Sequence, residues 1–520
     1  MSNSISLGST LTNTRMRTPK NLSQVSGMCT VCSADCTGFC EVGLSAVRGS
    51  EAIYPFATDI NQFASEKNYP LDFSHFSING RAFGVWGCHE NSKEVAYPQV
   101  KLETTFGKTN KVALKAPIIL PAIAKLNWKD YYSGAALAGV LAVIGEDVVA
   151  KDKNLVLKEG KVVSSPLLKE MVSSYRAYQK GFGDIILQAN ADDENLGVLD
   201  YAIKELNVKS VELKFGQAAK GIQGMTRVKN IDEAIKYQKM GYLVFPDPSN
   251  EEIAESYKHG IGQVFERIGK LPLWNESHLI ERVADLREMG AERICFKTGP
   301  FDPKDLITIL QIASKADVDL VTFDGAGGGT GNSPVKMMNE WGMSTIGLES
   351  IVHDILEKLQ DSGYDLPQIA IAGGFAMEDQ VFKGLALGAP YVTLVGIGRA
   401  AMAAAMVGKR VGNLILNGNI PKEYERYGSS IEEIFDEVKR LRCIYKDQTD
   451  QISPGAIGVY SYLQRIFSGL QQLMTLNRKF SLEFISREDI IPLTGIGASV
   501  SGLKTYEEKL QLELMRIGSL

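Results

Sequence analysis

The sequence predicts an α/β protein built on a (β/α)8 barrel, also called a TIM barrel. From about residue 117, short β-rich runs alternate with segments whose apolar residues recur at three- and four-residue spacing. Three successive runs also end in glycine, as expected where the last loops of a parallel barrel approach a phosphate. A doubly wound sheet is the alternative fold. It is less favoured because the glycine ends cluster on the last strands rather than the first.

Nine runs compete for the eight barrel positions. One of them, residues 242–248, follows closely on its predecessor and ends in Pro246 and Pro248, so we expect it in an insertion between a strand and its helix. The other eight are the predicted barrel strands, at 116–123, 140–146, 184–190, 210–217, 293–299, 320–326, 368–374 and 391–397.

The chain divides into three predicted regions. Residues 1–110 form an N-terminal extension of irregular structure and short strands over one end of the barrel, 111–417 the barrel, and 418–520 a helical tail. In the tail, Tyr460, Leu463, Ile466 and Leu470 are spaced as one helix face. That face is expected to pack on the barrel, and a groove for a partner is the alternative.

Composition excludes several functional classes. The formal net charge is −5 and Lys or Arg runs are absent from the sequence, which argues against a nucleic-acid-binding surface. The first residues lack the apolar core of a signal peptide. The longest near-apolar stretch, residues 135–145, is too short to span a bilayer. We therefore expect a cytoplasmic protein without membrane segments.

Glycine is concentrated at the ends of the last three predicted strands. The first of these runs into the loop DGAGGGTGNSP, which contains Gly327 and Gly328. The other two end in Gly373-Gly374 and in Gly396, Gly398 and Arg399. Without Cβ atoms the backbone can adopt positive φ and approach a flat or anionic ligand closely. We interpret the three ends as the site of a phosphate-bearing cofactor, with simple turn chemistry as the alternative.

Four of the seven cysteines lie within twelve residues, at Cys29, Cys32, Cys36 and Cys40. In a cytosolic chain such spacing indicates a metal site rather than disulfides. A contiguous run of thiolates favours a [4Fe–4S] cluster, which would serve as an electron relay, and structural zinc is the alternative.

Beyond composition and spacing, three motifs resemble the FMN-binding synthase domain of glutamate synthase over about residues 110–415. They are VELKFGQAAKGIQG at 211–224, the DGAGGGTGNSP loop, and the pair AGG…GIGRAAM. The tail is similar to that of stand-alone bacterial and archaeal members of this family. The resemblance implies a barrel that carries FMN. It also implies glutamate biosynthesis, a reaction in which ammonia adds to 2-oxoglutarate and reduced flavin delivers hydride to the imine.

The resemblance also implies roles for particular residues. Gly373, Gly374, Gly396, Gly398 and Arg399 would hold the FMN phosphate. Lys297 would stabilise negative charge on the reduced ring, unless it only pairs with a barrel carboxylate, and Gln188 would reach the polar edge of the flavin, unless it is simply a buried glutamine. Residues matching the family's glycine-glutamate and K-x2-Q-x2-K patterns would meet substrate carboxylates; these are Glu146, Lys214, Gln217 and Lys220.

The sequence departs from the family in several places, and three of them bear directly on the chemistry. The substrate loop reads Gly221-Ile222-Gln223-Gly224 in place of Pro-Gly-Glu-Gly, the three-cysteine cluster after the barrel is missing, and residue 2 is serine rather than a processed cysteine nucleophile. Nitrogen would then come as ammonia or an amine. Electrons would come from a partner such as a ferredoxin or an NAD(P)H-oxidising subunit, and self-association is left open.

Two functional classes follow from these observations. The first is an FMN- and iron–sulfur-dependent oxidoreductase acting on a 2-oxoacid and amino acid pair, that is, on CH–NH2 donors. The second is a flavin barrel that serves as an electron-transfer or regulatory subunit, and amine transfer resembling N-methylglutamate synthesis is a further alternative.

Overall fold

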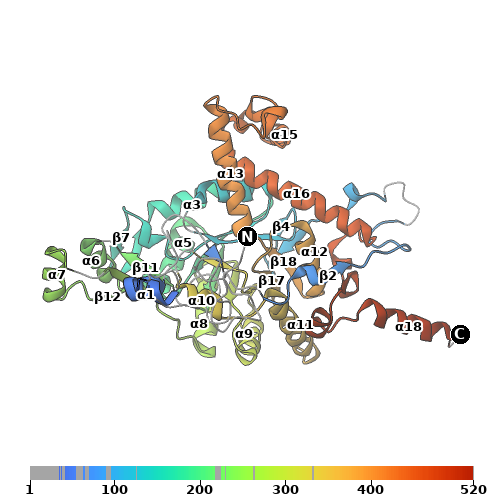
Figure 1. Cartoon of the computed structure of the whole chain (residues 1–520), viewed down its shortest axis with the longest axis horizontal. Coiled ribbons are helices and arrows are strands. Elements are labelled where there is room, and N and C mark those ends of the chain that lie inside the picture. The colour runs from blue at the N-terminus through green and yellow to red at the C-terminus, as the bar shows by residue number, and fades with distance from the viewer. Residues whose placement is uncertain are drawn as a thin grey trace.

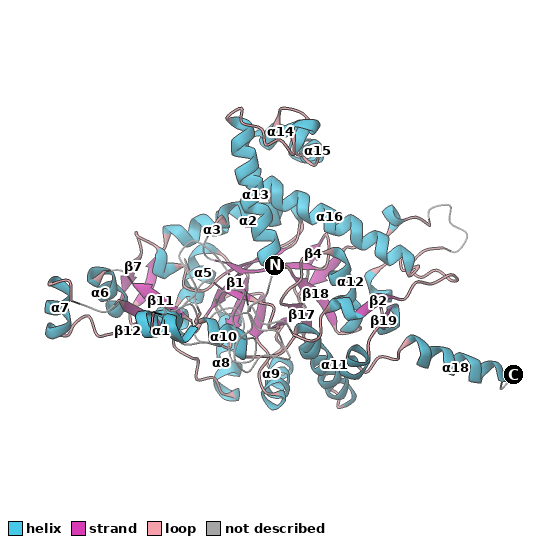
Figure 2. Cartoon of the chain, in the orientation of Figure 1, coloured by secondary structure: helices cyan, strands magenta, loops and turns pink. Residues whose placement is uncertain are grey.

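The computed structural model contains a closed barrel of eight parallel strands surrounded by helices, which confirms the predicted fold (Figures 1 and 2). It describes residues 34–35, 37, 41–53, 63–64, 69–89, 95–123, 126–216, 224–228, 230–261, 264–330 and 333–518. In spatial order the barrel strands are β5 (Ile118–Ile123), β6 (Leu141–Ile144), β9 (Ile185–Ala189), β10 (Ser210–Lys214), β14 (Arg293–Thr298), β15 (Leu320–Asp324), β17 (Gln368–Ala372) and β18 (Val392–Gly396).

Helices follow the barrel strands on the outside of the barrel. Several begin at a side-chain cap, as the sequence chemistry requires: Ser165, Asn275 and Ser344 each accept a hydrogen bond from a backbone N–H of the first turn. The helices are α2 (Trp128–Ala138), α3 (Pro166–Arg176), α4 (Ala191–Leu196), α5 (Val198–Leu206), α8 (Glu276–Glu288), α9 (Pro303–Lys315), α10 (Val335–Glu340), α11 (Thr345–Asp361), α12 (Glu378–Leu387) and α13 (Arg399–Leu416).

The run at 242–248 lies outside the barrel, as predicted. It forms β12 (Leu243–Phe245), which pairs antiparallel with β13 (Phe265–Ile268), and β13 pairs with β11 (Met225–Val228). With α6 (Ile231–Lys239) and α7 (Glu251–Lys258), this sheet makes an insertion between β10 and α8, seen at the left of Figure 1. We refer to residues 225–268, from the start of β11 to the end of β13, as the insertion.

A hairpin of β3 (Thr104–Phe106) and β4 (Val112–Leu114) closes the end of the barrel where the strands begin. Phe106 and Leu114 pack among the inward-facing side chains of the strands, and all of these side chains are buried. The Gly107 N–H donates to Gln368 Oε1 at 2.8 Å, at the first residue of β17. Since this end is filled by side chains, a ligand site belongs at the opposite end, where the strands finish.

The N-terminal region also reaches the end where the strands finish. There β1 (Phe63–Ala64) pairs antiparallel with β16 (Gly329–Thr330), a short strand within the glycine-rich loop after β15. Two further elements of the described N-terminal region are α1 (Glu41–Arg48) and β2 (Phe76–Ile78), and β2 pairs with β19 (Ile490–Pro492) of the tail.

The tail packs on the barrel through α16 (Pro454–Leu476), whose Tyr460, Leu463, Ile466 and Leu470 are all buried. This confirms the predicted packing face. Within residues 429–443 of the tail, the backbone leaves helical geometry at Phe435 (ψ 87°), which separates α14 (Ile431–Ile434) from α15 (Val438–Tyr445).

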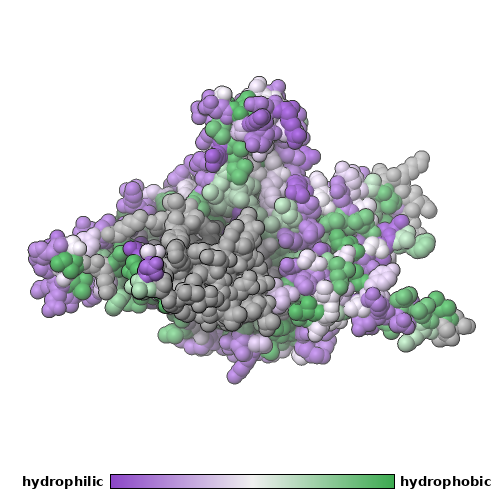
Figure 3. All heavy atoms as spheres, in the orientation of Figure 1, coloured by the Kyte–Doolittle hydropathy of each residue, from purple (hydrophilic) through white to green (hydrophobic). Residues whose placement is uncertain are grey.

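After α17 (Gly495–Ser501) the tail ends in α18 (Tyr506–Gly518), which projects from the body in Figure 1. Apolar residues reach the surface there (Figure 3), among them Leu510, Leu514 and Ile517. Among the described residues, the helices are all too short or too polar to cross a membrane.

Candidate functional site

Polar side chains line the inside of the barrel near the ends of its strands. The strand register places Lys297 beside Lys214 on one side and Thr322 on the other. Lys297 comes two residues after Cys295 on β14, and because Cys295 packs inside the barrel, Lys297 faces inward as well. Gln188 pairs in register with Glu212, and Asp324 with Ala372. The lower layers of the same strands are apolar. Such a polar layer above an apolar one is the arrangement of a ligand site.

Lys297 and Asp324 form a buried ion pair at this end, with Nζ 3.1 Å from Oδ2. This ion pair is the one expected under the alternative role of Lys297, in which it only pairs with a barrel carboxylate. The other carboxylate oxygen, Oδ1, is buried and has no hydrogen-bond partner among the described residues, and the same holds for Thr322 Oγ1. Buried polar atoms are rarely left without partners, so these two indicate room for a polar ligand.

Glu212 is a buried carboxyl in the middle of this layer. Its Oε1 accepts a hydrogen bond from Gln188 Nε2, while Gln188 Oε1 has no partner among the described residues. Burial raises the pKa of Glu212 above its ordinary value, although the neighbouring Lys297 ammonium and the Gln188 hydrogen bond act in the opposite direction. The sequence contained a signal for this residue, since Glu212 and Lys214 alternate on one face of β10.

The glycine loops after β15 and β17 are pressed together. A Cβ on Gly327 would lie 2.8 Å from the carbonyl of Gly373, so neither loop tolerates a side chain at this contact. Gly374 differs, because its φ is +94° and a Cβ there would point into nearly open space, with the nearest atom at 3.8 Å. The two loops therefore border a space that side chains leave free.

Helix α13 begins at the same end of the barrel. Its N-cap is Gly398, which has no side chain to cap the first turn. The exposed N–H groups of a first turn and the helix dipole together attract an anion. Arg399, the first residue of α13, is exposed. Gly396 lies against Ala372, where an added Cβ would come within 2.6 Å of the alanine side chain.

Glu146 and Lys214 form the second ion pair of the site, with Oε1 2.7 Å from Nζ. Lys214 is almost fully buried. It ends β10, and its carbonyl accepts a long hydrogen bond from Trp274 Nε1 at 3.4 Å. The structure brings together the predicted residues Glu146, Lys214, Gln188 and Lys297, whereas Gln217 and Lys220 lie outside the described residues.

A buried polar cluster beside Glu146 had no signal in the sequence. Asp147 Oδ2 pairs with Arg267 Nη2 of the insertion at 2.8 Å, and Asp147 Oδ1 accepts a hydrogen bond from Asn190 at 3.3 Å. Burial would raise the pKa of Asp147, but Arg267, Lys151 and the hydrogen bonds from Asn190 and Arg267 hold this pKa below its ordinary value. Burial and the Asp147 charge raise the pKa of Asp193 well above its usual range.

Cys29, Cys32, Cys36 and Cys40 lie outside the described residues, so the predicted cluster stays a prediction. Within the described part of the chain, His, Cys, Asp and Glu side chains form no group of three or more that could hold a metal ion. The remaining cysteines are single and unbridged: Cys295 is buried inside the barrel, Cys443 is exposed and Cys88 is half-buried.

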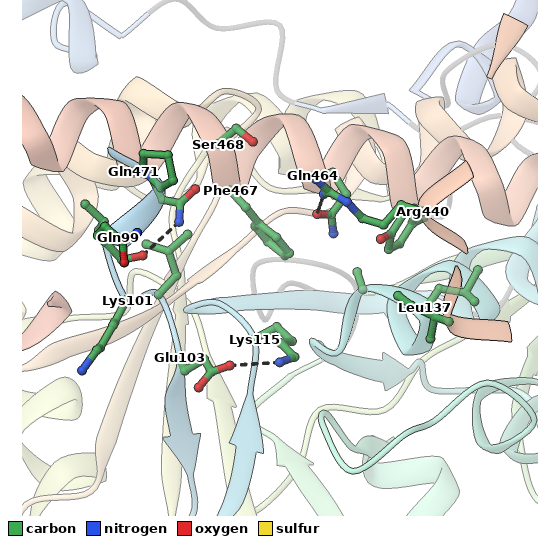
Figure 4. A pocket seen from close by; sticks show the side chains of 16 residues that line it. Gln99, Lys101, Glu103, Lys115, Leu137, Arg440, Gln464, Phe467, Ser468 and Gln471 are labelled. Atoms are coloured by element: carbon green, nitrogen blue, oxygen red, sulfur yellow. Dashed lines mark hydrogen bonds and ion pairs between the residues drawn. The ribbon is translucent and has the colours of Figure 1, made fainter. Parts of the chain in front are cut away.

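A cavity of about 600 Å³ lies at the opposite end of the molecule (Figure 4). Its walls come from residues 98–103, from Lys115 before β5, from the end of α2, and from α15 and α16. Among the polar groups that line it, Lys115 pairs with Glu103 at 2.9 Å and Arg440 donates a hydrogen bond to Gln464 at 2.8 Å. This cavity is separate from the polar layer inside the barrel, because Lys115 and α2 lead into the starts of strands.

Comparison with known proteins identifies one conserved region. Residues 271–410 match the family model described as the conserved region in glutamate synthase. This segment contains Lys297, Asp324 and all three glycine-ended strands. Curated protein sequences yielded no match.

Solved structures with a similar chain path include flavoenzymes. A flavocytochrome b2 variant with pyruvate bound is 12% identical with a TM-score of 0.45, and the match covers 82% of this chain and 78% of that one. The flavin-binding domain of baker's yeast flavocytochrome b2 is 14% identical with a TM-score of 0.45, covering 80% and 76%. (S)-Mandelate dehydrogenase, a monotopic membrane protein, is 11% identical with a TM-score of 0.41, covering 81% and 89%.

Proposed function

We propose, from the premise that residues 271–410 carry the conserved region of glutamate synthases, that this chain is an FMN-dependent oxidoreductase. Its reaction is the reductive amination of a 2-oxoacid such as 2-oxoglutarate, or the reverse, with electrons supplied by a partner protein. One observation carries the proposal. A layer of buried polar side chains with unsatisfied atoms lies at the same end of the barrel as three glycine loops and the start of α13.

The residues present fit FMN. Open space at Gly374 and the uncapped first turn of α13 suit a phosphate, because backbone N–H groups and a helix N-terminus attract anions there. The unsatisfied Gln188 Oε1 and Thr322 Oγ1 suit the polar edge of the flavin ring. A mononucleotide is favoured over FAD because the sequence has no dinucleotide-binding glycine motif after an early strand.

The chain's own groups have distinct tasks in this proposal. When bound, FMN would supply hydride exchange with the substrate carbon. Lys297 places a positive charge inside the barrel, held in position by Asp324, where it would stabilise negative charge that develops on the ring. Lys214, oriented by Glu146, would bind a substrate carboxylate together with Gln217 and Lys220. The buried layer also excludes bulk water from the reacting groups.

A [4Fe–4S] cluster on the four clustered cysteines would connect the site to the electron donor. The pairing of β1 with β16 supports this part of the proposal, because it ties the N-terminal region to the glycine-rich loop at the catalytic end. A relay needs its donor cluster and its acceptor on the same side of the molecule.

The first test identifies the cofactor. Protein purified anaerobically and then denatured should release FMN, and release of FAD or of no flavin would contradict the proposal. Gly374→Val should abolish retention, because the branched side chain would fill the free space. Gly363→Val is the matched control: Gly363 also has a positive φ (+83°) and open surroundings, but it follows α11 at the surface. It should bear the same backbone strain and keep its flavin.

The second candidate function, an electron-transfer or regulatory subunit, is favoured by the altered substrate loop at 221–224. One experiment distinguishes the two functions. Reduced protein is titrated anaerobically with ammonia and a panel of 2-oxoacids while the flavin absorbance is followed. Reoxidation by a member of the panel supports the enzyme, whereas reoxidation only by a protein acceptor supports the electron-transfer subunit.

A further inference from the structure

A buried ion pair joins the insertion to the catalytic end of the barrel. Arg267 projects from β13, and its Nη2 lies 2.8 Å from Oδ2 of Asp147, in the turn after β6. Both side chains are at least nine-tenths buried. Breaking such a pair from one side leaves an uncompensated buried charge, so the contact holds the two parts together firmly.

The guanidinium of Arg267 is also fixed by two aromatic rings of the insertion. Its central carbon lies 4.5 Å from the ring centre of Tyr242 and 5.1 Å from that of Tyr237. A planar cation packed against aromatic rings keeps one orientation. The two rings and the ion pair therefore hold the Arg267 guanidinium in one orientation, with Nη2 directed at Asp147.

The turn that receives this contact is strained. Asp147 has a φ of +62°, a conformation that costs a residue with a side chain on the order of 1–3 kcal/mol. Three interactions hold it there: the Arg267 pair, the Asn190 hydrogen bond to Oδ1, and its own N–H, which donates to Asp193 Oδ2 at 3.0 Å. Arg267 is the only one of these three partners that comes from outside the barrel strands and their own loops.

Glu146 immediately precedes this strained residue, and its direction depends on the turn. Its carboxylate lies 2.7 Å from the buried ammonium of Lys214. We propose that Arg267 is a positioning residue which acts through Asp147 to aim Glu146 at Lys214, so that the insertion forms part of the substrate-carboxylate site. The role of Lys214 in this statement rests on the proposed function.

The insertion is built to act as one body in this role. Lys270, just after β13, makes a second contact with the barrel: its N–H donates to Asp192 Oδ2 at 3.2 Å. The Gly269 N–H donates to the Gly224 carbonyl at 2.9 Å, which joins the end of β13 to the start of β11. The insertion and the residue just after β13 therefore contact the barrel at two points, through Arg267 and through Lys270.

The first experiment needs no cofactor and measures amide hydrogen exchange in residues 145–148 of the full chain. Arg267→Met should raise exchange there by at least about tenfold, because the strained turn loses its external restraint. Arg287→Met is the control, since Arg287 also pairs with a buried aspartate, Asp319, but at the opposite end of the barrel. Unchanged exchange in Arg267→Met would overturn the proposal. If that variant does not fold, Asp147→Asn removes the same pair and takes its place.

The second experiment separates positioning from general destabilisation. The dissociation constant of 2-oxoglutarate, used as the probe, is read from the flavin absorbance of the FMN-loaded protein. Arg267→Met and Glu146→Gln should each weaken binding by about tenfold. The double variant should be no weaker than either single one, because Arg267 acts through Glu146. Arg267→Lys should restore part of the affinity. Additive losses would overturn the proposal.

The two experiments distinguish the failure of each idea. If the protein binds no flavin or no oxoacid, the proposed function fails, and hydrogen exchange still decides whether Arg267 restrains the turn. If flavin and oxoacid bind but the Arg267 variant matches the wild type in both measurements, the proposed function stands and the positioning role of Arg267 falls.

Discussion

Lys297 is held inside the barrel by Asp324, so a substitution at Lys297 affects both residues. If Lys297 lies beside the flavin ring as proposed, Lys297→Met should lower the flavin potential, with a loss on the order of 1.5–3 kcal/mol in stabilisation of the reduced form. It also leaves Asp324 buried without its partner. The double variant Lys297→Met/Asp324→Asn avoids that second effect. A potential equal to that of the wild type in the double variant, measured by anaerobic redox titration with FMN bound, would contradict the assigned role.

Glu349 of α11 is a buried carboxyl without a function in the site. Both of its oxygens lack hydrogen-bond partners among the described residues, and burial raises its pKa well above the ordinary 4.5, although Arg487 acts in the opposite direction. The folded protein therefore keeps this proton at pH values where the unfolded chain has released it. Its contribution to the free energy of unfolding is full below pH 4.5 and falls as pH rises through the raised folded-state value.

Glu349→Leu should remove this dependence on pH. At pH 8 the variant should be more stable than the wild type by about 1–3 kcal/mol, and the difference should shrink as pH falls toward 4.5. Unfolding midpoints across this range provide the measurement. Glu357→Leu, an exposed position on the same helix, serves as the control and should change stability little at any pH. A variant that is less stable than the wild type at pH 8 would show that the carboxylate is charged and paired.

At the scale of elements, glycines let α13 and α16 approach until their backbones touch. A Cβ on Gly458 would lie 2.5 Å from the Ala404 carbonyl oxygen and 3.0 Å from the Cα of Gly408. Gly458→Ala should therefore destabilise the protein by about 1–3 kcal/mol, although alanine favours helix over glycine. Gly495→Ala is the matched control, because a Cβ at that helical position meets open space. Equal thermal midpoints for the two variants would refute close packing of these helices.

The elements that the sequence predicted well are those whose signal is local. Short-range periodicity, glycine and proline were enough to predict the eight barrel strands, the position of residues 242–248 outside the barrel, and the buried face of α16. The break at Phe435 was not predictable, because the residues on either side of it continue the helical pattern. The strand register, which follows from closing the barrel, is what places Lys297 beside Lys214 and Gln188 beside Glu212.

At the scale of the whole molecule, contacts between distant segments build the parts of the site that the sequence could not show. Arg267 and Asp147 are 120 residues apart and pair only because the insertion docks on the barrel. Asp324 was visible as the end of a glycine-terminated strand, but its pairing with Lys297 depends on neighbouring strands in the closed barrel. Individual candidates could therefore be read from motifs, whereas their partners required the three-dimensional fold.

The N-terminal region connects to both the barrel and the tail, which bears on how electrons would enter the site. One strand of this region pairs with the glycine-rich loop and another pairs with β19. We predict one [4Fe–4S] cluster per chain on Cys29, Cys32, Cys36 and Cys40, four thiolates close enough in sequence to surround a single cluster. Anaerobically purified protein should contain about four iron and four acid-labile sulfide atoms per chain.

Substitution of single cysteines tests this assignment and its connection to the flavin. Cys32→Ser should lose the iron and slow reduction of the flavin by an external protein donor, while flavin content and reduction by dithionite stay close to wild type. Cys443→Ser is the control, since Cys443 is exposed and distant in sequence from the four. If the protein contains one zinc per chain and no iron, the four cysteines bind a structural metal and not an electron relay. Flavin reduction by the protein donor at an unchanged rate in Cys32→Ser would remove the cluster from the electron path.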